Sequence, residues 1–129
     1  MKIEHVALNI PEPVKAAQWY VEHLGMQIAR SSNVSPYVHF IVDSEGHGVL
    51  EFYCDPRSAV PDYAAMNPFI LHIAYSVEDI EATRAKLVAA GAAAEGETMT
   101  TPNGDQLAFV RDPWGVVLQL AKRVKPLVG

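Results

Sequence analysis

The sequence predicts an α+β fold made of two copies of one module, each of which runs strand, helix and then about three strands. Three observations support this prediction. The octet Ile3–Ile10 resembles the octet Ile70–Val77. Each octet is followed by a segment with the apolar spacing of a helix and a glycine at its end. Each module then closes with two strand-like segments joined by a glycine-containing turn.

The first module begins with a strand over Ile3–Ile10. A helix is predicted over about Glu12–Leu24, and the glycine at position 25 is a natural stop for it. The apolar residues of this segment recur at helical spacing: Val14, Ala17, Val21 and Leu24. Two further strands are predicted over Val38–Val42 and Val49–Tyr53, because both are rich in β-branched and aromatic residues.

The second module repeats this order. A strand over Ile70–Val77 precedes a helix over about Glu78–Ala90, whose acidic first turn suits the helix dipole. We interpret the alanine run Ala89–Ala94 as the end of this helix. Two closing strands are predicted over Leu107–Val110 and Val116–Leu120.

The modules span about residues 1–56 and 69–122 of a single domain, 1–129. The segment between them, Cys54–Pro68, contains three prolines and no clear period, which predicts an ordered linker. Neither module has enough core alone, so we expect the two to pack edge to edge or to swap with a partner chain. Exposed sheet edges of this kind also predict a homodimer.

Composition and charge limit the classes of protein to which this chain can belong. Half of the residues are apolar and 19% are charged, as in a globular domain. Cys54 is the only cysteine, which excludes an intramolecular disulfide and favours a reducing, cytoplasmic setting. The net charge of −5 argues against nucleic acid as a partner, and the longest uncharged stretch, Tyr63–Val77, is too short and polar to span a membrane. The one basic cluster is interpreted as a solvated tail: Lys122, Arg123 and Lys125.

Four polar residues stand at equivalent points of the repeat. His5 and His72 lie in the opening strands, whereas Glu51 and Gln119 follow them by 46 and 47 positions in the closing strands. Each is a polar residue among apolar ones, and burying a carboxylate in a sheet is costly unless it is paired or bound to a metal. Two imidazoles, a carboxylate and an amide oxygen suit a divalent ion such as Zn²⁺, Ni²⁺, Fe²⁺, Mn²⁺ or Co²⁺.

Nearly the whole chain resembles the vicinal-oxygen-chelate superfamily, also called the glyoxalase/bleomycin resistance protein/dioxygenase superfamily. The turn that precedes Leu118-Gln119-Leu120 is a specific marker of that fold. The residues that carry the resemblance are His5-Val6-Ala7-Leu8, Trp19-Tyr20, Leu24-Gly25-Met26, His72-Ile73-Ala74 and Arg111-Asp112-Pro113-Trp114-Gly115. The resemblance implies two βαβββ modules that form an open, eight-stranded, cup-shaped mixed sheet with helices on the outside. It also implies a metal site in the cup, with the ligands His5, Glu51, His72 and Gln119.

One position departs from the family pattern. The enzymes of the family usually have Glu where this chain has Gln119, and in glyoxalase I-like enzymes that Glu often serves as the proton-transfer base. Glu51, the only carboxylate of the four, is therefore the predicted catalytic base. Gln119 is either a metal ligand or a hydrogen-bonded amide on a closing strand.

The resemblance favours a metal-dependent lyase or isomerase of the glyoxalase type. Such an enzyme enolises a small-molecule substrate with vicinal oxygens, such as a 2-oxoaldehyde thiol adduct. Two alternatives stay open. One is a metal-free binding protein like the bleomycin-resistance members, and the other is a small Fe-dependent dioxygenase-like enzyme, because two His and one carboxylate can hold Fe²⁺.

Overall fold

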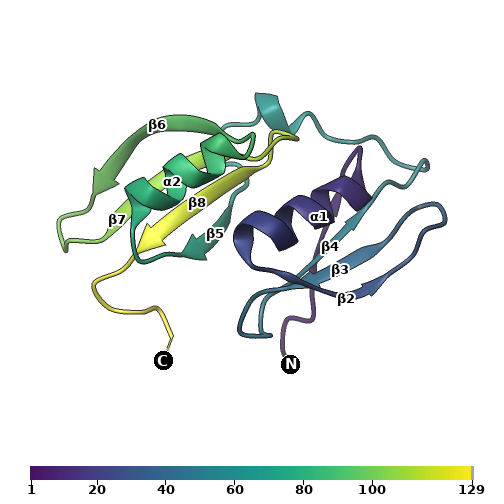
Figure 1. Ribbon diagram of the computed structural model, residues 1–129, viewed down its shortest axis with the longest axis horizontal. Helices are drawn as coiled ribbons and strands as arrows, with labels where there is room; N and C mark the ends of the chain where they lie inside the picture. Colours follow the sequence, from purple (N-terminus) through teal and green to yellow (C-terminus); the bar gives the residue numbers. More distant parts are fainter. Residues whose placement is uncertain (129) are drawn as a thin grey trace. The chain divides into compact units, whose positions relative to one another are not determined.

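The computed structural model describes residues 1–128 and confirms the α+β class (Figure 1). The chain divides into two compact units, Met1–Pro61 and Asp62–Gly129, here called the N-terminal unit and the C-terminal unit. Each unit has the βαβββ order, with one helix against one face of an open, four-stranded mixed sheet. Within residues 1–128, no helix has the length and apolar character that crossing a membrane requires.

The N-terminal unit has the strand order β1-β4-β3-β2, in which β1 is parallel to β4 and the other pairs are antiparallel. Its elements are β1 (Val6–Asn9), α1 (Pro13–Leu24), β2 (Gln27–Ser31), β3 (His39–Val42) and β4 (Val49–Tyr53). Helix α1 starts with a proline in its first turn and ends at Gly25, which adopts the left-handed conformation with φ 68°. Its buried Tyr20 meets Phe52 of β4 edge to face, with ring centroids 4.9 Å apart.

The C-terminal unit repeats this topology with the order β5-β8-β7-β6. Its elements are η1 (Tyr63–Ala65), β5 (Ile73–Ser76), α2 (Ile80–Ala89), β6 (Ala93–Thr100), β7 (Gln106–Arg111) and β8 (Val117–Lys122). Helix α2 is capped by Asp79, whose carboxylate accepts a 3.0 Å hydrogen bond from the Ala82 amide. Leu87 of the helix and Leu118 and Leu120 of β8 are fully buried, which places the core of this unit between helix and sheet.

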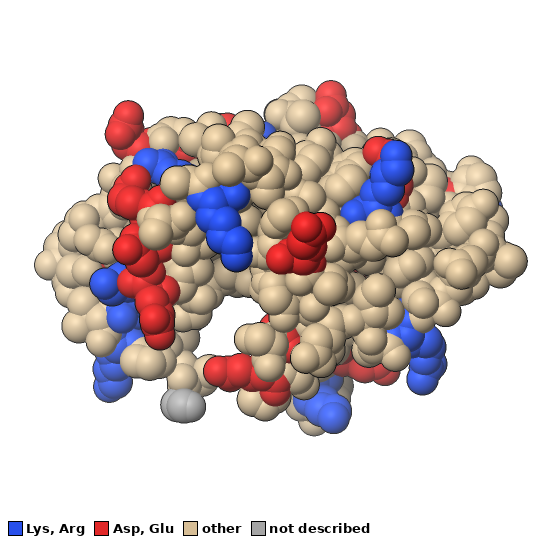
Figure 2. Space-filling view, in the orientation of Figure 1, with Lys and Arg blue, Asp and Glu red and all other residues tan. Residues whose placement is uncertain are grey.

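The sequence-based bounds differ from the structure at several points. The opening strands are shorter than predicted, so that His5 and His72 each directly precede a strand. The alanine run is not all helix end, because Ala93 and Ala94 open β6. On the face drawn in Figure 2, acidic and basic side chains are interspersed over both units.

Candidate functional site

The strand register of the N-terminal unit places His5 and Glu51 on one face of the sheet. Glu51 pairs with Ala7 on β1 and with Phe40 on β3. Paired residues share a face, and residues two apart on a strand do so as well, so His5 is on the side of Ala7 and Glu51. Phe52 alternates with Glu51 and contacts helix α1. The His5–Glu51 face is therefore the face that α1 does not cover.

His5 lies between two carboxylates. Its Nδ1 is 2.8 Å from Oε1 of Glu4, and its Nε2 is 3.5 Å from Oε1 of Glu51. The ring stands edge to face against Phe40, with centroids 5.3 Å apart. The Glu51 side chain is only 16% exposed, whereas that of Glu4 is 83% exposed. The two carboxylates thus have different environments: Glu51 is held against the sheet and Glu4 reaches the ring from solvent.

The C-terminal unit builds the same arrangement from its own residues. Gln119 pairs with Ala74 on β5 and with Phe109 on β7, as Glu51 pairs in the other unit. His72 stands edge to face against Phe109, with ring centroids 5.4 Å apart. Its Nδ1 is 2.8 Å from the carbonyl oxygen of Pro68. Gln119 is buried, with 7% of its surface exposed.

The hydrogen bonds of both histidines suit metal coordination through Nε2. A carbonyl oxygen can only accept, so Nδ1 of His72 carries a hydrogen, and in the neutral imidazole Nε2 then presents a lone pair. The Nδ1 of His5 meets a carboxylate in the same way. Metal-ligating histidines commonly donate their second ring N–H to a carboxylate or a backbone carbonyl, which orients the ring. With Nδ1–H of His5 given to Glu4, its Nε2 and the Glu51 oxygen are two acceptors that face each other, and a cation satisfies both.

The structure thus brings His5 and Glu51 together in one unit, and places His72 and Gln119 around one phenylalanine in the other. The meeting of all four around one ion remains a prediction. Among residues 1–128, no group of three His, Cys, Asp or Glu side chains is arranged to hold a metal ion. His39 does not belong to the candidate site. It is 4% exposed, pairs with Phe52 and places its Nδ1 2.8 Å from the Tyr37 carbonyl.

Two aromatic residues of the site fit the register of the repeat in the sequence, but their contact with the histidines is not predicted from it. Phe40 and Phe109 each support a histidine ring and each pair with the polar residue of the closing strand. They precede Glu51 and Gln119 by 11 and 10 positions, so their spacing repeats as the spacing of the polar residues does.

Arg111 has no comparable signal, and it supports the segment that leads to His72. Its Nη1 donates to the carbonyl oxygens of Tyr63 and Gly115 at 3.0 and 3.3 Å, and its Nη2 donates to that of Met66 at 2.8 Å. Its Nε and Nη2 also hold both oxygens of Glu95, at 3.0 and 3.2 Å. Met66 lies two residues before Pro68, the partner of His72, so Arg111 fixes the start of the segment that orients the ring.

A family model described as the Glyoxalase/Bleomycin resistance protein/Dioxygenase superfamily matches residues 2–120. A "Probable lactoylglutathione lyase" of Vibrio cholerae is 28% identical over 134 aligned positions, which cover 99% of this chain and 95% of that protein.

Two solved structures show the same fold at lower identity. A glyoxalase family protein from Bacillus cereus has a TM-score of 0.80 at 19% identity and covers 97% of this chain and 95% of its own. TnmS3, an antibiotic binding protein from a Streptomyces species, has a TM-score of 0.66 at 21% identity, with 95% and 98% covered.

Proposed function

The chain belongs to the glyoxalase/bleomycin resistance protein/dioxygenase superfamily, and we infer its function from that membership. We propose that it is a metal-dependent lyase or isomerase of the glyoxalase type, acting on a small molecule with two neighbouring oxygens. The observation that carries the proposal is the repeated arrangement of histidine, phenylalanine and polar residue on the uncovered face of each sheet. Of the two polar residues, only Glu51 can act as a base.

In this proposal His5, Glu51, His72 and Gln119 hold a divalent metal ion. When bound, the ion supplies Lewis-acid polarisation of a substrate carbonyl. The two histidines are oriented for this role by the Glu4 carboxylate and the Pro68 carbonyl, which occupy the ring nitrogens turned away from it.

Glu51 takes the proton from the carbon beside the substrate carbonyl and returns it to the carbonyl carbon, while the hydroxyl proton moves to the former carbonyl oxygen, so that the product is an isomer of the substrate. Its side chain is 16% exposed, so few water molecules compete for the carboxylate oxygens. Gln119 cannot take this part, because an amide is not basic. Its carbonyl oxygen serves as a neutral ligand, and the residue is buried on β8.

The substrate class proposed is a thiol adduct of a 2-oxoaldehyde. The relatives named as probable lactoylglutathione lyases in two Vibrio species support it, because the alignment covers 95% of their length.

A second candidate is a metal-free binding protein, and two observations favour it. Gln119 leaves the C-terminal half of the set without a carboxylate, and Phe69, which is 76% exposed, stands edge to face against Phe109 at 5.7 Å. Aromatic rings of this kind suit a flat organic ligand. The fold of TnmS3, an antibiotic binding protein, shows that this architecture is compatible with such a role.

The test compares two substitutions at the repeated position. Ni²⁺ and Zn²⁺ are titrated calorimetrically into the wild type, Glu51→Gln and Gln119→Glu, and each protein is assayed with hemithioacetals of 2-oxoaldehydes. Glu51→Gln is expected to bind metal more weakly and to lose isomerase activity by a factor of ~10² or more. Gln119→Glu adds a negative ligand and is expected to bind metal more tightly. Glu45→Gln, which changes an exposed glutamate of the β3–β4 turn, is the matched control.

Equal metal affinity of the wild type and Glu51→Gln would show that Glu51 is not a ligand. If the wild type binds neither ion, the metal-free binding protein becomes the better reading.

A further inference from the structure

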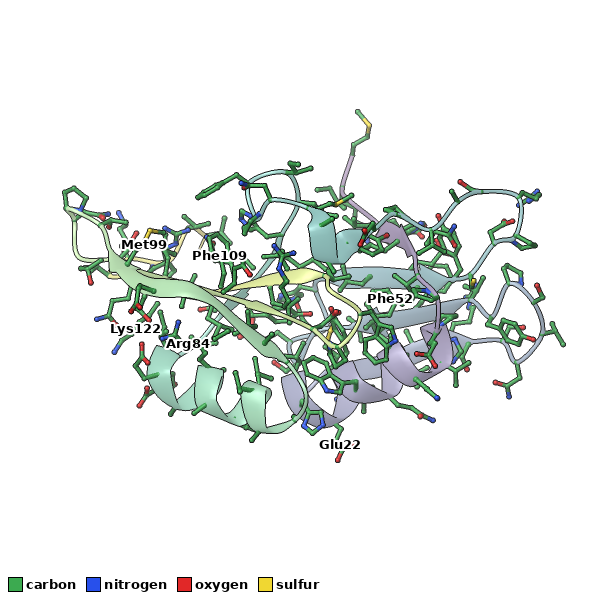
Figure 3. All side chains as sticks on the ribbon, turned by 90° about the horizontal axis from the view of Figure 1, so that it is seen from above. Glu22, Phe52, Arg84, Met99, Phe109 and Lys122 are labelled. Carbon is green, nitrogen blue, oxygen red and sulfur yellow. The ribbon has the colours of Figure 1, made fainter. Side chains whose placement is uncertain are left out.

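The C-terminal unit contains a pocket of about 230 Å³ that the candidate site does not use. Its lining residues are Gly104, Gln106, Lys122, Arg123 and Val124. Lys122 pairs with Gln106 across β7 and β8, and shares a strand face with Leu120. This is the face toward α2, opposite that of Gln119, and Figure 3 shows Lys122 on the helix side and Phe109 on the other side of the sheet. The pocket is therefore separate from the candidate site.

Asp105 holds two of the lining residues, Arg123 and Val124, in place. It is 7% exposed, and its carboxylate accepts from the Val124 amide at 2.8 Å and from NH1 of Arg123 at 3.0 Å. These bonds, with the Val124 amide as the largest cause, lower the pKa of Asp105. The chain after β8 is thus tied to the β6–β7 loop. The prediction of a solvated basic tail is wrong for Arg123, which is held by an ion pair.

Three side chains around the pocket have donors to spare. Among residues 1–128, the Lys122 ammonium and the Gln106 amide make no hydrogen bond or ion pair, and Arg123 uses only NH1. Asp105 offsets much of the Arg123 charge, so the unpaired positive charge that lines the pocket is that of Lys122. Unshared N–H donors on cations are the groups that bind oxyanions.

The shape of the pocket sets the size of its occupant. Pockets for drug-sized ligands run to about 300–1,000 Å³, so this volume suits one ionic group and not a large molecule. Gly104 keeps the space open, because a Cβ atom there would lie 3.1 Å from Cγ2 of Val124.

We propose that Lys122, Arg123 and Gln106 form a binding site for a phosphate group, either inorganic or carried by a phosphate ester. The three donors come from three side chains, which suits a tetrahedral anion, and Lys122 contributes a positive charge that is not paired with any carboxylate among residues 1–128.

The experiment titrates inorganic phosphate into the ¹⁵N-labelled chain at constant ionic strength set by chloride. The side-chain amide signal of Gln106 and the backbone amide of Val124 are followed by NMR. Lys122→Gln is expected to weaken binding about tenfold, as the loss of a charged hydrogen bond does. Lys125→Gln, which removes an exposed basic residue that does not line the pocket, is the matched control and is expected to leave the affinity within twofold of the wild type.

Further arms define the ligand and the alternative outcomes. A simple phosphate monoester is titrated beside inorganic phosphate. Binding of either supports the site, and the one with the higher affinity identifies the ligand as a free ion or an esterified group. Acetate, which is planar and singly charged, is expected to bind at least tenfold more weakly. Equal binding of acetate, or equal weakening by Lys122→Gln and Lys125→Gln, would overturn the proposal. So would an absence of shifts at Gln106 and Val124, and the backbone spectrum of each variant shows that the fold is retained.

Discussion

Replacing Arg111 by methionine is expected to destabilise the C-terminal unit through backbone groups far away in sequence. Methionine keeps much of the aliphatic stem but removes all five N–H donors. Three of the acceptors are carbonyl oxygens, those of Tyr63, Met66 and Gly115, and the other two are the oxygens of Glu95. The arginine side chain is 14% exposed, so water reaches few of the groups that it leaves behind.

The magnitude follows from these contacts. The loss of a charged donor costs about 1 kcal/mol for each of the Met66 and Gly115 carbonyls. The loss at the Tyr63 carbonyl is smaller, because this oxygen also accepts a hydrogen bond from the Met66 amide at 3.1 Å. Glu95 is 36% exposed and regains water, so its ion pair with Arg111 adds only about 1 kcal/mol. The sum is a loss of about 3 kcal/mol in the free energy of unfolding.

Urea unfolding followed by tryptophan fluorescence measures this loss. A Trp19→Phe background leaves Trp114, which lies in the turn beside Arg111, as the reporter for the C-terminal unit. Arg30→Met is the matched control. Arg30 is exposed on the edge strand β2, and its side chain makes no hydrogen bond or ion pair within residues 1–128, so its change should stay within about 0.5 kcal/mol. A loss below about 1 kcal/mol for Arg111→Met would refute the reasoning that this side chain holds the 63–66 segment.

Three further predictions concern packing, pH and assembly. Gly115→Ala should lower the free energy of unfolding by more than 2 kcal/mol in the same assay, because φ is +89° and the new Cβ atom would lie 2.6 Å from the Ala64 amide nitrogen. The control Gly46→Ala has a similar φ but open space around the new Cβ atom, so it should lower the free energy of unfolding by about 1 kcal/mol. The Val124 amide lowers the pKa of Asp105 below 3.8, so the stability that Asp105 contributes is present above that pH and is lost as the pH falls through its folded pKa. Asp105→Asn should therefore flatten the acid limb of a plot of unfolding free energy against pH, and an unchanged limb would contradict this. The chain should sediment as a homodimer at tens of micromolar, whereas a monomer at that concentration would count against the prediction.

The elements that the sequence predicts well are those with a buried face. Helix α1 carries an apolar stripe and ends at a glycine, and β4 has the bounds predicted for it. The missed strands, β2 and β6, are both edge strands. All five residues of β2 are exposed, so it has no apolar alternation to detect and depends on backbone hydrogen bonds to β3.

In the candidate site, too, some features could be predicted from the sequence and others could not. The repeat indicates equivalent positions for its polar residues, because spacings of 46 and 47 positions along two copies of one topology lead to equivalent register in the sheets. What supports those residues could not be predicted. Pro68 and three of the five acceptors of Arg111 act through backbone carbonyl oxygens, which every residue type has. The two acceptors in the 63–66 segment lie 45 and 48 positions from the arginine.

The difference between Glu51 and Gln119 is the most informative feature of the repeat. A closing strand that served packing alone would gain stability from an apolar residue at position 119, since a buried amide costs free energy unless its hydrogen bonds are made. The chain instead keeps a polar residue there, opposite a phenylalanine that supports a histidine, as in the other unit. Gln119 retains the shape of a glutamate side chain and its capacity for hydrogen bonds, but it lacks the negative charge. That combination is what a site needs when one copy supplies the base and the other only an oxygen ligand, and it is the reason why Gln119→Glu and Glu51→Gln should have opposite effects on metal affinity.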